Sequence, residues 1–444
     1  MGHNMSVENR ALNLISGIRI GRLFGRYDYD LRIPSSEDNQ IARMALLYGD
    51  NGTGKTTILK LLFHLLSPAD KQGHRTFLAR VPFSNFSVLF SNGIVISSVR
   101  AQTELTGRYI LRIKESDGTS LDGAVQTENG RVTDESISPE AIKIVDRIAD
   151  LKLTTFLLGD DRMLQSDKFP REPRDRYYIH GQEDIGLEAP RTAASPDLRD
   201  LAVHISLERT STWLRQHLIQ ASSRGEAEAQ HIYAGIVEDI NRVGVPQKKD
   251  YARQKKKLLQ ELKALENRGR SFTDFGLISR INIKRLADGM KNASSNKHAF
   301  VAQVIRSFID GQQARLNALD DLNRRLDQFV ELINRFLRDK RIRIEVGKGI
   351  SIVSDSNASL RPEYLSSGEK QLLLLFCNVL TSSESASLFL IDEPELSLNV
   401  KWQRQLIDAL TDITSGSPCQ FILATHSIEL LAKHRELVIK LDPS

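Results

Sequence analysis

The feature that most constrains this chain is a glycine-rich segment between an expected strand and an expected helix. Residues 49–57 read GDNGTGKTT, with the spacing G-x-x-x-x-G-K-T. A short apolar run at residues 44–48 precedes this segment, and apolar residues recur at helical spacing over residues 58–66. A strand that enters such a loop and a helix that leaves it are the context of a phosphate-binding P-loop. The pattern therefore predicts an α/β fold.

Each residue type in this loop has a physical role in holding phosphates. Glycines let backbone amides close around a phosphate, and the N-terminus of the following helix adds a partial positive charge. Lys55 is expected to reach the β and γ phosphates, and Thr56 to bind Mg²⁺. ATP and Mg²⁺ are therefore the expected cofactors. The predicted nucleotide-binding residues of this loop are Gly49, Asn51, Gly52, Gly54, Lys55, Thr56 and Thr57.

A second informative segment lies more than three hundred residues downstream, at residues 364–399. Its serine–glycine turn, LSSGEKQ at residues 365–371, opens an apolar helix, and the apolar strand at residues 388–391 ends in Asp392 and Glu393. Mg²⁺ prefers oxygen ligands, so Asp392 suits a metal site, reached through a water. Glu393 suits the general base that orients an attacking water. Adjacent acids also occur in plain polar turns, but the P-loop elsewhere in the chain favours a nucleotide site.

One histidine follows a third apolar strand. Residues 421–423 are apolar, and Ala424, Thr425, His426 and Ser427 come directly after them. A lone histidine is more often structural than functional. Because this one lies at the end of the strand that follows the acidic pair, we predict that His426 senses the γ phosphate.

Taken in order, these segments resemble the Walker A, signature, Walker B and switch-histidine motifs of ABC-type ATPases. Their long separation, filled by expected helices, resembles the branch that contains the SMC, RecF and OLD proteins. The resemblance implies a P-loop ABC ATPase head that is split in sequence into two lobes by a helical, short coiled-coil-like insertion. The expected domains are residues 1–165 (N-terminal lobe), 166–345 (connector and helical insertion) and 346–444 (C-terminal lobe).

The resemblance also implies that the active site is shared between subunits. The signature of one subunit would cover the nucleotide held by the Walker motifs of another, so ATP would bridge a dimer and its hydrolysis would loosen the interface. The protein is accordingly expected to be a homo-oligomer built from ABC dimers. The signature residues that would contact the neighbour's nucleotide are Ser366, Ser367, Gly368 and Glu369.

Two motifs of the family fit this chain loosely. The glutamine-containing Q-loop has no clear counterpart, and Gln165 and residues 159–162, at the end of the expected strand at residues 154–158, are candidates. A solvated loop explains residues 159–162 equally well. Residues 396–399, LSLN, only loosely match the D-loop.

The remaining pattern divides into strands near the P-loop and helices in the middle. Alternation predicts a bent hairpin at residues 18–33, strands at 86–90, 94–99 and 109–113, a short helix at 142–151 and a hairpin at 341–353. Apolar residues at three-four spacing predict paired helices at 248–268 and 309–338, with 274–296 at the tip between them. A helix of thirty residues is about 45 Å long, which predicts a short arm.

The densest basic run lies in this expected arm. It consists of Lys248, Lys249, Arg253, Lys255, Lys256 and Lys257, with Tyr251 the one aromatic residue within it. A solvated helix face and a surface that binds a polyanion both fit, and the polyanion would be DNA, RNA or an acidic protein that imitates them. Sparse aromatic residues argue against stacking on single strands.

Composition sets mild limits. The net charge is +5 with a pI near 9.0, so a basic surface requires local clustering. Cys377 and Cys419 lie in apolar segments, so neither a disulfide nor a metal site is expected. The N-terminus lacks an apolar signal region and no apolar run approaches ~18 residues, so we expect a cytoplasmic protein with no membrane segment. Met5 is a candidate natural start.

The chain stops eighteen residues after His426, where an OLD nuclease would continue into a TOPRIM nuclease domain. Any nuclease effector is therefore expected on a separate polypeptide. Within its branch the chain most resembles the AriA-type ATPase subunits of PARIS anti-phage defence systems. That resemblance implies an ATPase that holds a TOPRIM nuclease and releases it when a phage-encoded DNA mimic is sensed. A RecF-like or SMC-like DNA-repair ATPase remains an alternative, and a transporter subunit fits the helical insertion poorly.

Overall fold

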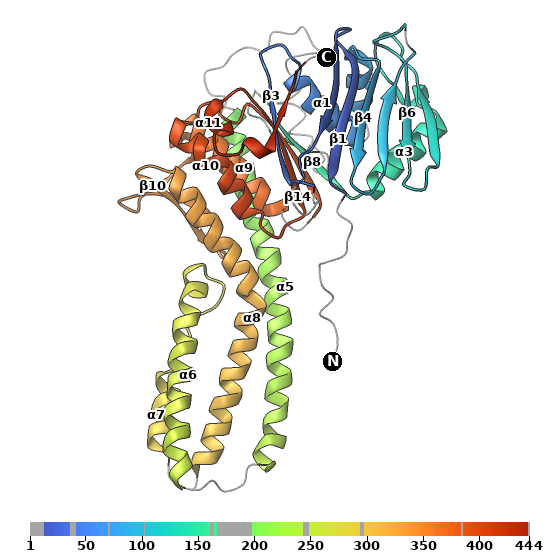
Figure 1. Ribbon diagram of the computed structural model, residues 1–444. Helices are drawn as coiled ribbons and strands as arrows, with labels where there is room; N and C mark the ends of the chain where they lie inside the picture. The colour runs from blue at the N-terminus through green and yellow to red at the C-terminus, as the bar shows by residue number, and fades with distance from the viewer. Residues whose placement is uncertain are drawn as a thin grey trace. The chain divides into compact units, whose positions relative to one another are not determined.

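The structure is a computed structural model that describes residues 13–35, 41–69, 72–101, 103–159, 164–166, 198–242, 248–293, 297–382 and 385–442, without the side chains at 198–199, 237–242 and 248–251. It divides into two compact units (Figure 1). The first consists of Met1–Ala202 with Ser366–Ser444, and the second of Val203–Leu365.

The first unit is built around a mixed sheet that joins both ends of the sequence. Its order is β15-β3-β14-β13-β8-β9; all neighbours are parallel except β8 and β9. The rings of Phe156, Phe389 and Phe421 stack across three strands, with centroids 4.6 and 5.1 Å apart. The strands are β3 (Met44–Tyr48), β8 (Thr154–Leu158), β9 (Leu164–Ser166), β13 (Ser387–Asp392), β14 (Cys419–Thr425) and β15 (Val438–Lys440). The predicted α/β fold is confirmed.

A second sheet of the same unit is antiparallel, as the alternating pattern predicts. Its order is β2-β1-β4-β5-β6-β7. The helix α1 (Lys55–Leu66) contacts β5 of this sheet and β8, β13 and β14 of the first sheet, which explains why it is apolar on most sides. The strands are β1 (Ile15–Leu23), β2 (Tyr27–Arg32), β4 (Asn85–Phe90), β5 (Val95–Val99), β6 (Tyr109–Lys114) and β7 (Ser120–Val125).

The remaining helices of the first unit surround these sheets. The predicted helix at residues 142–151 is α3, which begins after the N-cap Ser138 and packs on β7. Its Ser138 hydroxyl accepts a hydrogen bond from the Ala141 amide. The helices are α2 (His74–Arg80), α3 (Pro139–Asp150), α9 (Ser367–Ser382), α10 (Val400–Ile413) and α11 (Ile428–Leu431).

One largely buried ion pair ties the first turn of α5 (Leu198–Arg242) to the signature helix α9. Asp200 and Lys370 form a close pair, and their side chains are only 13% and 14% exposed. Removing one member of a buried pair leaves the other charge without compensation in a poorly solvated place. The pair therefore holds the first turn of α5 to the helix that carries the signature turn, within the first unit.

Replacing Asp200 with asparagine is expected to lower the free energy of unfolding by about 3 kcal/mol, because the Lys370 ammonium stays buried without its partner. The change is measured by urea unfolding. The control is Asp30→Asn, which breaks the Arg19–Asp30 pair, where both side chains are 53% exposed. That pair is expected to contribute less than about 1 kcal/mol. Equal losses in the two variants would contradict the account.

The second unit consists of long helices and a small sheet. Its helices are the rest of α5, α6 (Lys248–Asp274), α7 (Lys284–Asn292) and α8 (His298–Phe336), and its strands are β10 (Lys340–Glu345), β11 (Gly349–Ser354) and β12 (Ser359–Leu360). The predicted apolar stripes of α6 and α8 are confirmed, because their members are buried: Leu258, Leu262, Leu265, Leu319, Leu322, Leu326, Phe329, Ile333 and Phe336.

The helices are longer than the sequence analysis predicts. The 39 residues of α8 and the 45 residues of α5 correspond to about 58 Å and 68 Å, against the predicted 45 Å. The region after residue 196 is expected to be helical, but no bounds are predicted for α5, because its buried side includes polar residues such as Ser206 and Thr210. Nor do residues 274–296 form a tip: the Val346 amide donates to the Phe275 carbonyl at 2.9 Å, which places the end of α6 beside the β10–β11 hairpin.

The β10–β11 hairpin belongs to the second compact unit and not to the C-terminal lobe, where the sequence prediction places most of it. The Ile350 amide donates to the Ser211 hydroxyl at 3.2 Å, so the hairpin is held by α5 as well as by the end of α6. Along the sequence the units divide after residues 202 and 365, whereas the predicted insertion spans residues 166–345. The hairpin groups with the helices because its hydrogen bonds go to them.

Both cysteines are buried, and neither is in a disulfide bond. Desolvation raises the pKa of the Cys419 thiol to about 12, so it is a neutral core side chain. This agrees with the predicted core role. In the part of the chain that the structure describes, no helix has the length and apolarity that crossing a bilayer requires.

Candidate active site

The site is formed where three parallel strands end in register. Asp392 pairs with Ala424, and Ala424 pairs with Leu47, so β13, β14 and β3 reach the same edge of the sheet together. The loops that leave these strands therefore begin side by side. They carry the acidic pair, the histidine and the P-loop, which are separated by more than three hundred residues in sequence.

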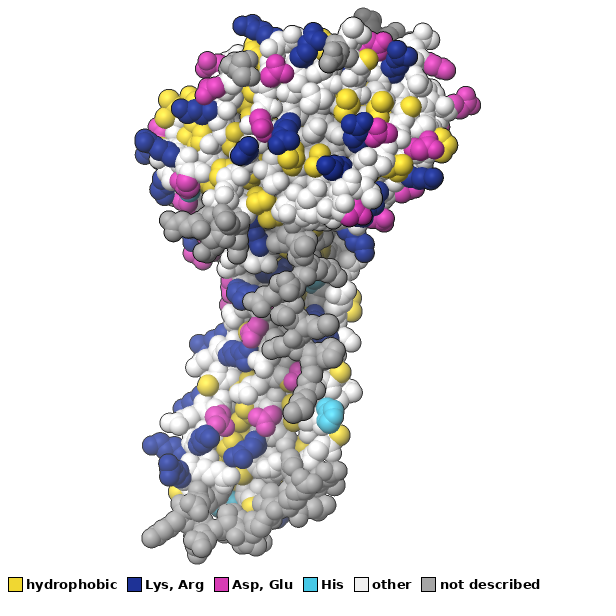
Figure 2. All heavy atoms as spheres, turned by 45° about the vertical axis from the view of Figure 1, so that its right-hand side comes forward, with side chains coloured by type: hydrophobic (Ala, Val, Ile, Leu, Met, Phe, Trp, Pro, Cys, Tyr) yellow, Lys and Arg dark blue, Asp and Glu magenta, His cyan; other side chains and the backbone are white. Residues whose placement is uncertain are grey.

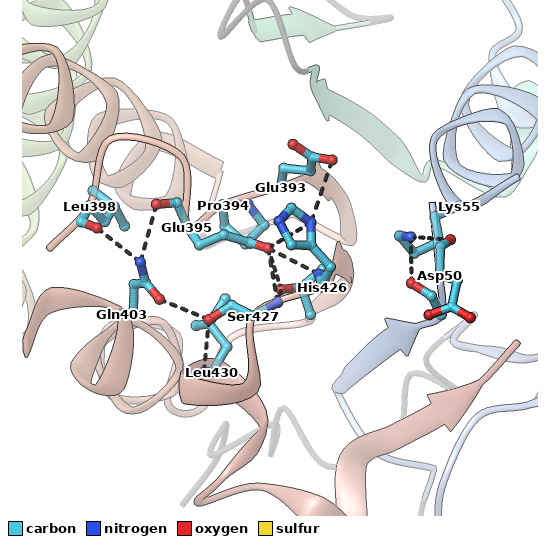
Figure 3. A network of polar contacts seen from close by, with 12 residues as sticks. Asp50, Lys55, Glu393, Pro394, Glu395, Leu398, Gln403, His426, Ser427 and Leu430 are labelled. Atoms are coloured by element: carbon cyan, nitrogen blue, oxygen red, sulfur yellow. Dashed lines mark hydrogen bonds and ion pairs between the residues drawn. The ribbon is translucent and has the colours of Figure 1, made fainter. Parts of the chain in front are cut away.

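The P-loop holds its lysine inward. Lys55 is only 6% exposed, and its ammonium donates to the Gly49 carbonyl at 2.7 Å and to the Asp50 carbonyl at 2.9 Å (Figure 3). The Tyr29 hydroxyl donates to the Thr53 carbonyl at 2.8 Å. The pKa of the Tyr29 phenol is raised, mainly because the group is buried and to a smaller extent because Tyr27 lies nearby. The lysine is thus positioned by the loop whose amides would surround a phosphate.

The position of Gly54 requires glycine for two reasons. Its φ is +92°, in the left-handed region, and a Cβ atom there would lie 2.7 Å from Leu23 Cδ2 and 3.3 Å from the Phe24 ring. The turn between β1 and β2 therefore packs directly against the P-loop. A side chain at this position would displace both the turn and the loop.

The acidic pair has two different environments. Asp392 is 3% exposed at the end of β13, whereas the Glu393 side chain is 27% exposed. Glu393 has a φ of 44°, a left-handed conformation that costs a residue with a side chain about 1–2 kcal/mol. Its amide donates to the Ala424 carbonyl at 2.8 Å, which fixes the bend. The strain turns the Glu393 carboxylate out of the strand.

His426 lies between two carboxylates. Its Nδ1 is 3.6 Å from Glu393 Oε1 and 3.5 Å from Glu395 Oε1, and the imidazole is 47% exposed (Figure 3). The structure therefore brings the predicted base and the predicted sensor together. Glu395 is absent from the sequence-predicted site. No local pattern indicates its role, because its partners lie thirty residues further along the chain.

Glu395 and Gln403 form hydrogen bonds to residues 425–427, which we call the histidine loop. Glu395 Oε1 accepts hydrogen bonds from the Thr425 hydroxyl at 2.7 Å, the His426 amide at 3.0 Å and the Ser427 amide at 3.2 Å. The Gln403 amide group donates to the Leu398 carbonyl at 2.9 Å and accepts from the Ser427 hydroxyl at 2.8 Å. The histidine loop is thus bonded to both ends of the loop that follows the acidic pair.

The signature turn is a reciprocal helix cap. The Glu369 amide donates to the Ser366 hydroxyl at 3.3 Å, and the Ser366 amide donates to the Glu369 carboxylate at 2.7 Å. Ser366 and Ser367 are exposed, whereas Gly368 and Glu369 are buried. A Cβ atom on Gly368 would lie 2.5 Å from the Ser397 carbonyl of the same chain. The serines are therefore available to a second molecule, while Gly368 provides room for the loop after β13.

The oxygen groups at this edge fit Mg²⁺. Asp392 offers a carboxylate at the end of β13, and Thr56 offers a hydroxyl in the first turn of α1. Hard oxygen ligands of this kind, completed by phosphate oxygens and water, suit Mg²⁺. Among the described residues, no group of three or more His, Cys, Asp or Glu side chains could hold a metal ion by itself. Any such ion would depend on nucleotide oxygens.

The remaining predictions fall partly outside the described residues. The Q-loop candidate at residues 159–162 lies mostly there, and Gln165 lies in β9 opposite Leu157. In the basic run, the side chains of Lys248, Lys249 and Tyr251 are not described. Those of Arg253, Lys256 and Lys257 are exposed, and Lys255 donates to the Lys291 carbonyl at 3.3 Å, which joins the start of α6 to the end of α7.

A protein-family model described as "AAA domain, putative AbiEii toxin, Type IV TA system" matches residues 183–432, more than half of the chain. The chain belongs to this AAA-domain family. The AAA-domain protein is also 34% identical over 84 residues to the lipoprotein-releasing system ATP-binding protein LolD of Ruegeria pomeroyi. That match covers 19% of this chain and 36% of LolD, so the chain spans about a third of its relative's length. The family match identifies an AAA domain in this chain, and the second match is to an ABC-type ATP-binding protein.

Solved structures of Smc head domains match most of the AAA-domain protein. One is the Smc head domain with an extended coiled coil, bound to the C-terminal domain of ScpA, from Pyrococcus furiosus, with a TM-score of 0.37, 18% identity and coverage of 96% of this chain and 95% of that chain. Another is the Smc head domain with a coiled coil and joint from Pyrococcus yayanosii, with a TM-score of 0.37, 15% identity and coverage of 94% and 93%.

Proposed function

We propose that this AAA-domain protein binds and hydrolyses ATP at the carboxyl edge of its parallel sheet, in a site completed by a second copy of the chain. The observation that carries the proposal is the common register of β3, β14 and β13. Because of that register, Lys55, Asp392, Glu393 and His426 start from adjacent loops. A lysine, two acids and a histidine in this arrangement suit phosphoryl transfer to water.

Each side chain has a role that follows from its position. Lys55 would exchange its two loop carbonyls for the β and γ phosphate oxygens. Thr56 and Asp392 would hold Mg²⁺, which neutralises phosphate charge when bound. The turned-out Glu393 would orient the attacking water and accept its proton. His426, beside Glu393, would donate to the γ phosphate from its exposed edge.

The second copy would supply the signature turn. In their own chain, Ser366 acts as a helix cap and Ser367 is exposed on the first turn of α9. Gly368 packs against the Ser397 carbonyl instead. The two serines, backed by the N-terminus of a sixteen-residue helix, suit an anion on another molecule. ATP would then bridge two subunits in a homo-oligomer built from such dimers.

ATP binding and hydrolysis would close and open the dimer, and this change in the assembly would control a separate effector protein. The family description names a putative toxin of a type IV toxin–antitoxin system, which is compatible with a bacterial system of two components. The resemblance to AriA-type subunits adds a TOPRIM nuclease as effector and a phage-encoded DNA mimic as trigger. The experiment is co-expression with the product of the neighbouring gene. A nuclease that copurifies, and is released on triggering, supports the proposal; ATPase activity that depends on duplex DNA would favour the RecF-like alternative.

The helical unit offers a surface for a polyanion. Residues 248–293 contain thirteen Lys and Arg but five Asp and Glu, so this segment carries a net charge of +8 in a chain whose total is +5. Lys and Arg side chains are spread over the described part of the unit (Figure 2). Positive charge gathered in one segment, and not spread over the chain, favours the binding of nucleic acid or of an acidic protein that imitates it.

Neutralising Arg253, Lys256 and Lys257 with glutamine is expected to weaken binding to duplex DNA. If each charge contacts a phosphate, the slope of log K against log salt concentration should become less steep by about one for each charge removed, or about three in total. Fluorescence anisotropy with a labelled duplex at several salt concentrations measures both effects. The control neutralises Arg324, Arg335 and Lys348, which pair with Asp321, Glu331 and Glu345 more closely than Lys257 pairs with Glu261. Equal effects in the two triple variants would refute a specific basic surface.

A further inference from the structure

The carboxylate of Glu395 is a buried acid that the proposed chemistry does not use. Its side chain is 6% exposed, so it lies behind the site while Glu393 faces outward. Oε1 alone accepts three hydrogen bonds, two of them from the consecutive amides of His426 and Ser427. Among the described residues, Oε2 is buried with no hydrogen-bond partner. A group that is committed in this way positions its neighbours and does not exchange protons with substrate.

The bonds of Glu395 determine where the imidazole lies. They fix the backbone at Thr425, His426 and Ser427, which is the point where β14 ends and the chain turns away. The imidazole itself is half exposed and has no hydrogen bond that would hold it independently of Glu395 and Glu393 within the described region. Its reach toward a γ phosphate therefore depends on the backbone that Glu395 holds.

The loop that carries Glu395 is in turn attached to the signature helix. The side chain of Gln371, on α9, donates to the Pro394 carbonyl at 3.5 Å, and Gly368 packs against the Ser397 carbonyl. Ser397 has a φ of 66°, so this loop is bent into a disfavoured conformation at the point of contact. A shift of α9 must therefore shift residues 394–398.

Gln403 connects the far end of the same loop to the histidine. Its amide nitrogen lies 2.9 Å from the Leu398 carbonyl and 3.5 Å from the Glu395 carbonyl, while its amide oxygen accepts from the Ser427 hydroxyl (Figure 3). Gln403 belongs to α10, a regular fourteen-residue helix. The loop is therefore held to the histidine at both ends, by Glu395 at one and by Gln403 at the other.

We propose that Glu395 and Gln403 are positioning residues that couple the signature helix of a subunit to the γ-phosphate sensor His426 of the same subunit. The inference rests on the proposed function, in which the signature contacts a neighbour's nucleotide. When the signature of a subunit contacts the neighbour's nucleotide, α9 would move the loop at residues 394–398. That movement would reposition His426 beside the subunit's own nucleotide. The two sites of a dimer would then be set for hydrolysis together.

The test compares the turnover number, the dissociation constant for ATP and the melting temperature of matched variants. Glu395→Ala should lower kcat about 10- to 100-fold, as loss of an orienting partner does. ATP affinity should stay within about twofold, because the P-loop is untouched. Glu395→Gln should keep kcat within about threefold, since its carbonyl oxygen can accept the same three donors. The control, Glu429→Ala, removes an acid whose side chain is 37% exposed and pairs with Arg404.

A second variant tests the same link without removing Glu395, so the test does not depend on whether the Glu395→Ala protein folds. Gln403→Leu should lower kcat about threefold or more with unchanged ATP affinity, because it breaks the link at Ser427 and leaves the Glu395 carboxylate in place. Near-normal kcat in both Glu395→Ala and Gln403→Leu would overturn the inference. So would parallel losses of kcat and affinity, or a Glu395→Gln protein as impaired as the alanine variant.

The two levels of proposal fail in different ways. If the wild-type chain hydrolyses no ATP, the proposed function fails and this inference fails with it. If the wild-type chain is active and Glu393→Gln is inactive, while the Glu395 and Gln403 variants behave normally, the proposed function stands and only the coupling is wrong.

Discussion

Replacing Glu393 with glutamine is expected to lower the rate of ATP hydrolysis by about 10²- to 10⁴-fold, the usual contribution of a general base. Glu393 is turned out of β13 by its left-handed backbone and lies beside His426, and we propose that it accepts the proton from water. The amide keeps the shape of the side chain but cannot accept the proton. ATP affinity should change little, because the P-loop contacts are unaltered.

The same variant should accumulate in the closed, ATP-bound dimer, since hydrolysis is the step proposed to loosen the interface. Phosphate release measures turnover, and light scattering with and without ATP measures the dimer. Glu429→Gln serves as the control, because that side chain pairs with Arg404 near the surface. Wild-type turnover in the Glu393 variant, or an unchanged nucleotide dissociation rate with no accumulation of dimer, would refute the assignment.

Replacing Lys55 with alanine is expected to weaken ATP binding by about 100-fold, which corresponds to roughly 2.7 kcal/mol. Its ammonium is held by the Gly49 and Asp50 carbonyls and lies at the centre of the loop that would receive phosphates. The variant loses the one cation of residues 49–57. Titration with a fluorescent ATP analogue measures the change.

The matched control for Lys55 is Lys60→Ala, on the same helix but five residues away from the loop. It should bind ATP as the wild-type chain does. A Lys55 variant with unchanged affinity, at a wild-type melting temperature, would show that the loop does not hold the phosphates. A drop in affinity common to both variants would point to the helix and not to the lysine.

The sequence predicts the site where local patterns are strong. Residues 44–57 combine an apolar strand, a glycine-rich turn and a Lys-Thr pair, and the structure forms β3, the loop and α1 there. The strands before Asp392 and before His426 are also predicted, because short apolar runs bounded by polar residues are typical of buried parallel strands. The parallel arrangement then brings their ends together.

The rest of the site depends on contacts that no local pattern encodes. Glu395 looks like any acid in a turn, because its three donors come from residues 425–427. Gly368 is predicted as a phosphate contact, yet its packing against Ser397 is set by tertiary structure. The Ser366–Glu369 cap could have been found, since Ser-x-x-Glu before an apolar run is a known helix start.

The helical unit shows the same limit. The stripes of α6 and α8 are regular and are predicted, whereas the bounds of α5 are not, because its buried side includes the polar residues Ser206, Thr210 and Ser211. Its helix is supported by contacts far along the chain, such as the Arg315–Glu226 pair with α8. The length of such a helix and the elements it contacts are determined by tertiary packing, so the periodicity of its sequence does not predict them.

We propose that each active site takes its Walker residues from one subunit and its signature from another, and mixing two inactive variants tests this exchange. Lys55→Ala removes nucleotide binding. Ser367→Glu places a negative charge on the exposed first turn of α9, which suits the helix but repels a neighbour's ATP. Each variant alone should be inactive. Mixed in equal amounts, half of the dimers would pair one of each and hold one intact site, so ATPase activity should rise above that of either variant, up to about a quarter of the wild-type level. Activity at that upper limit is expected only if the two sites act independently, and the proposed coupling through His426 predicts less. A mixture as inactive as its components would contradict the account.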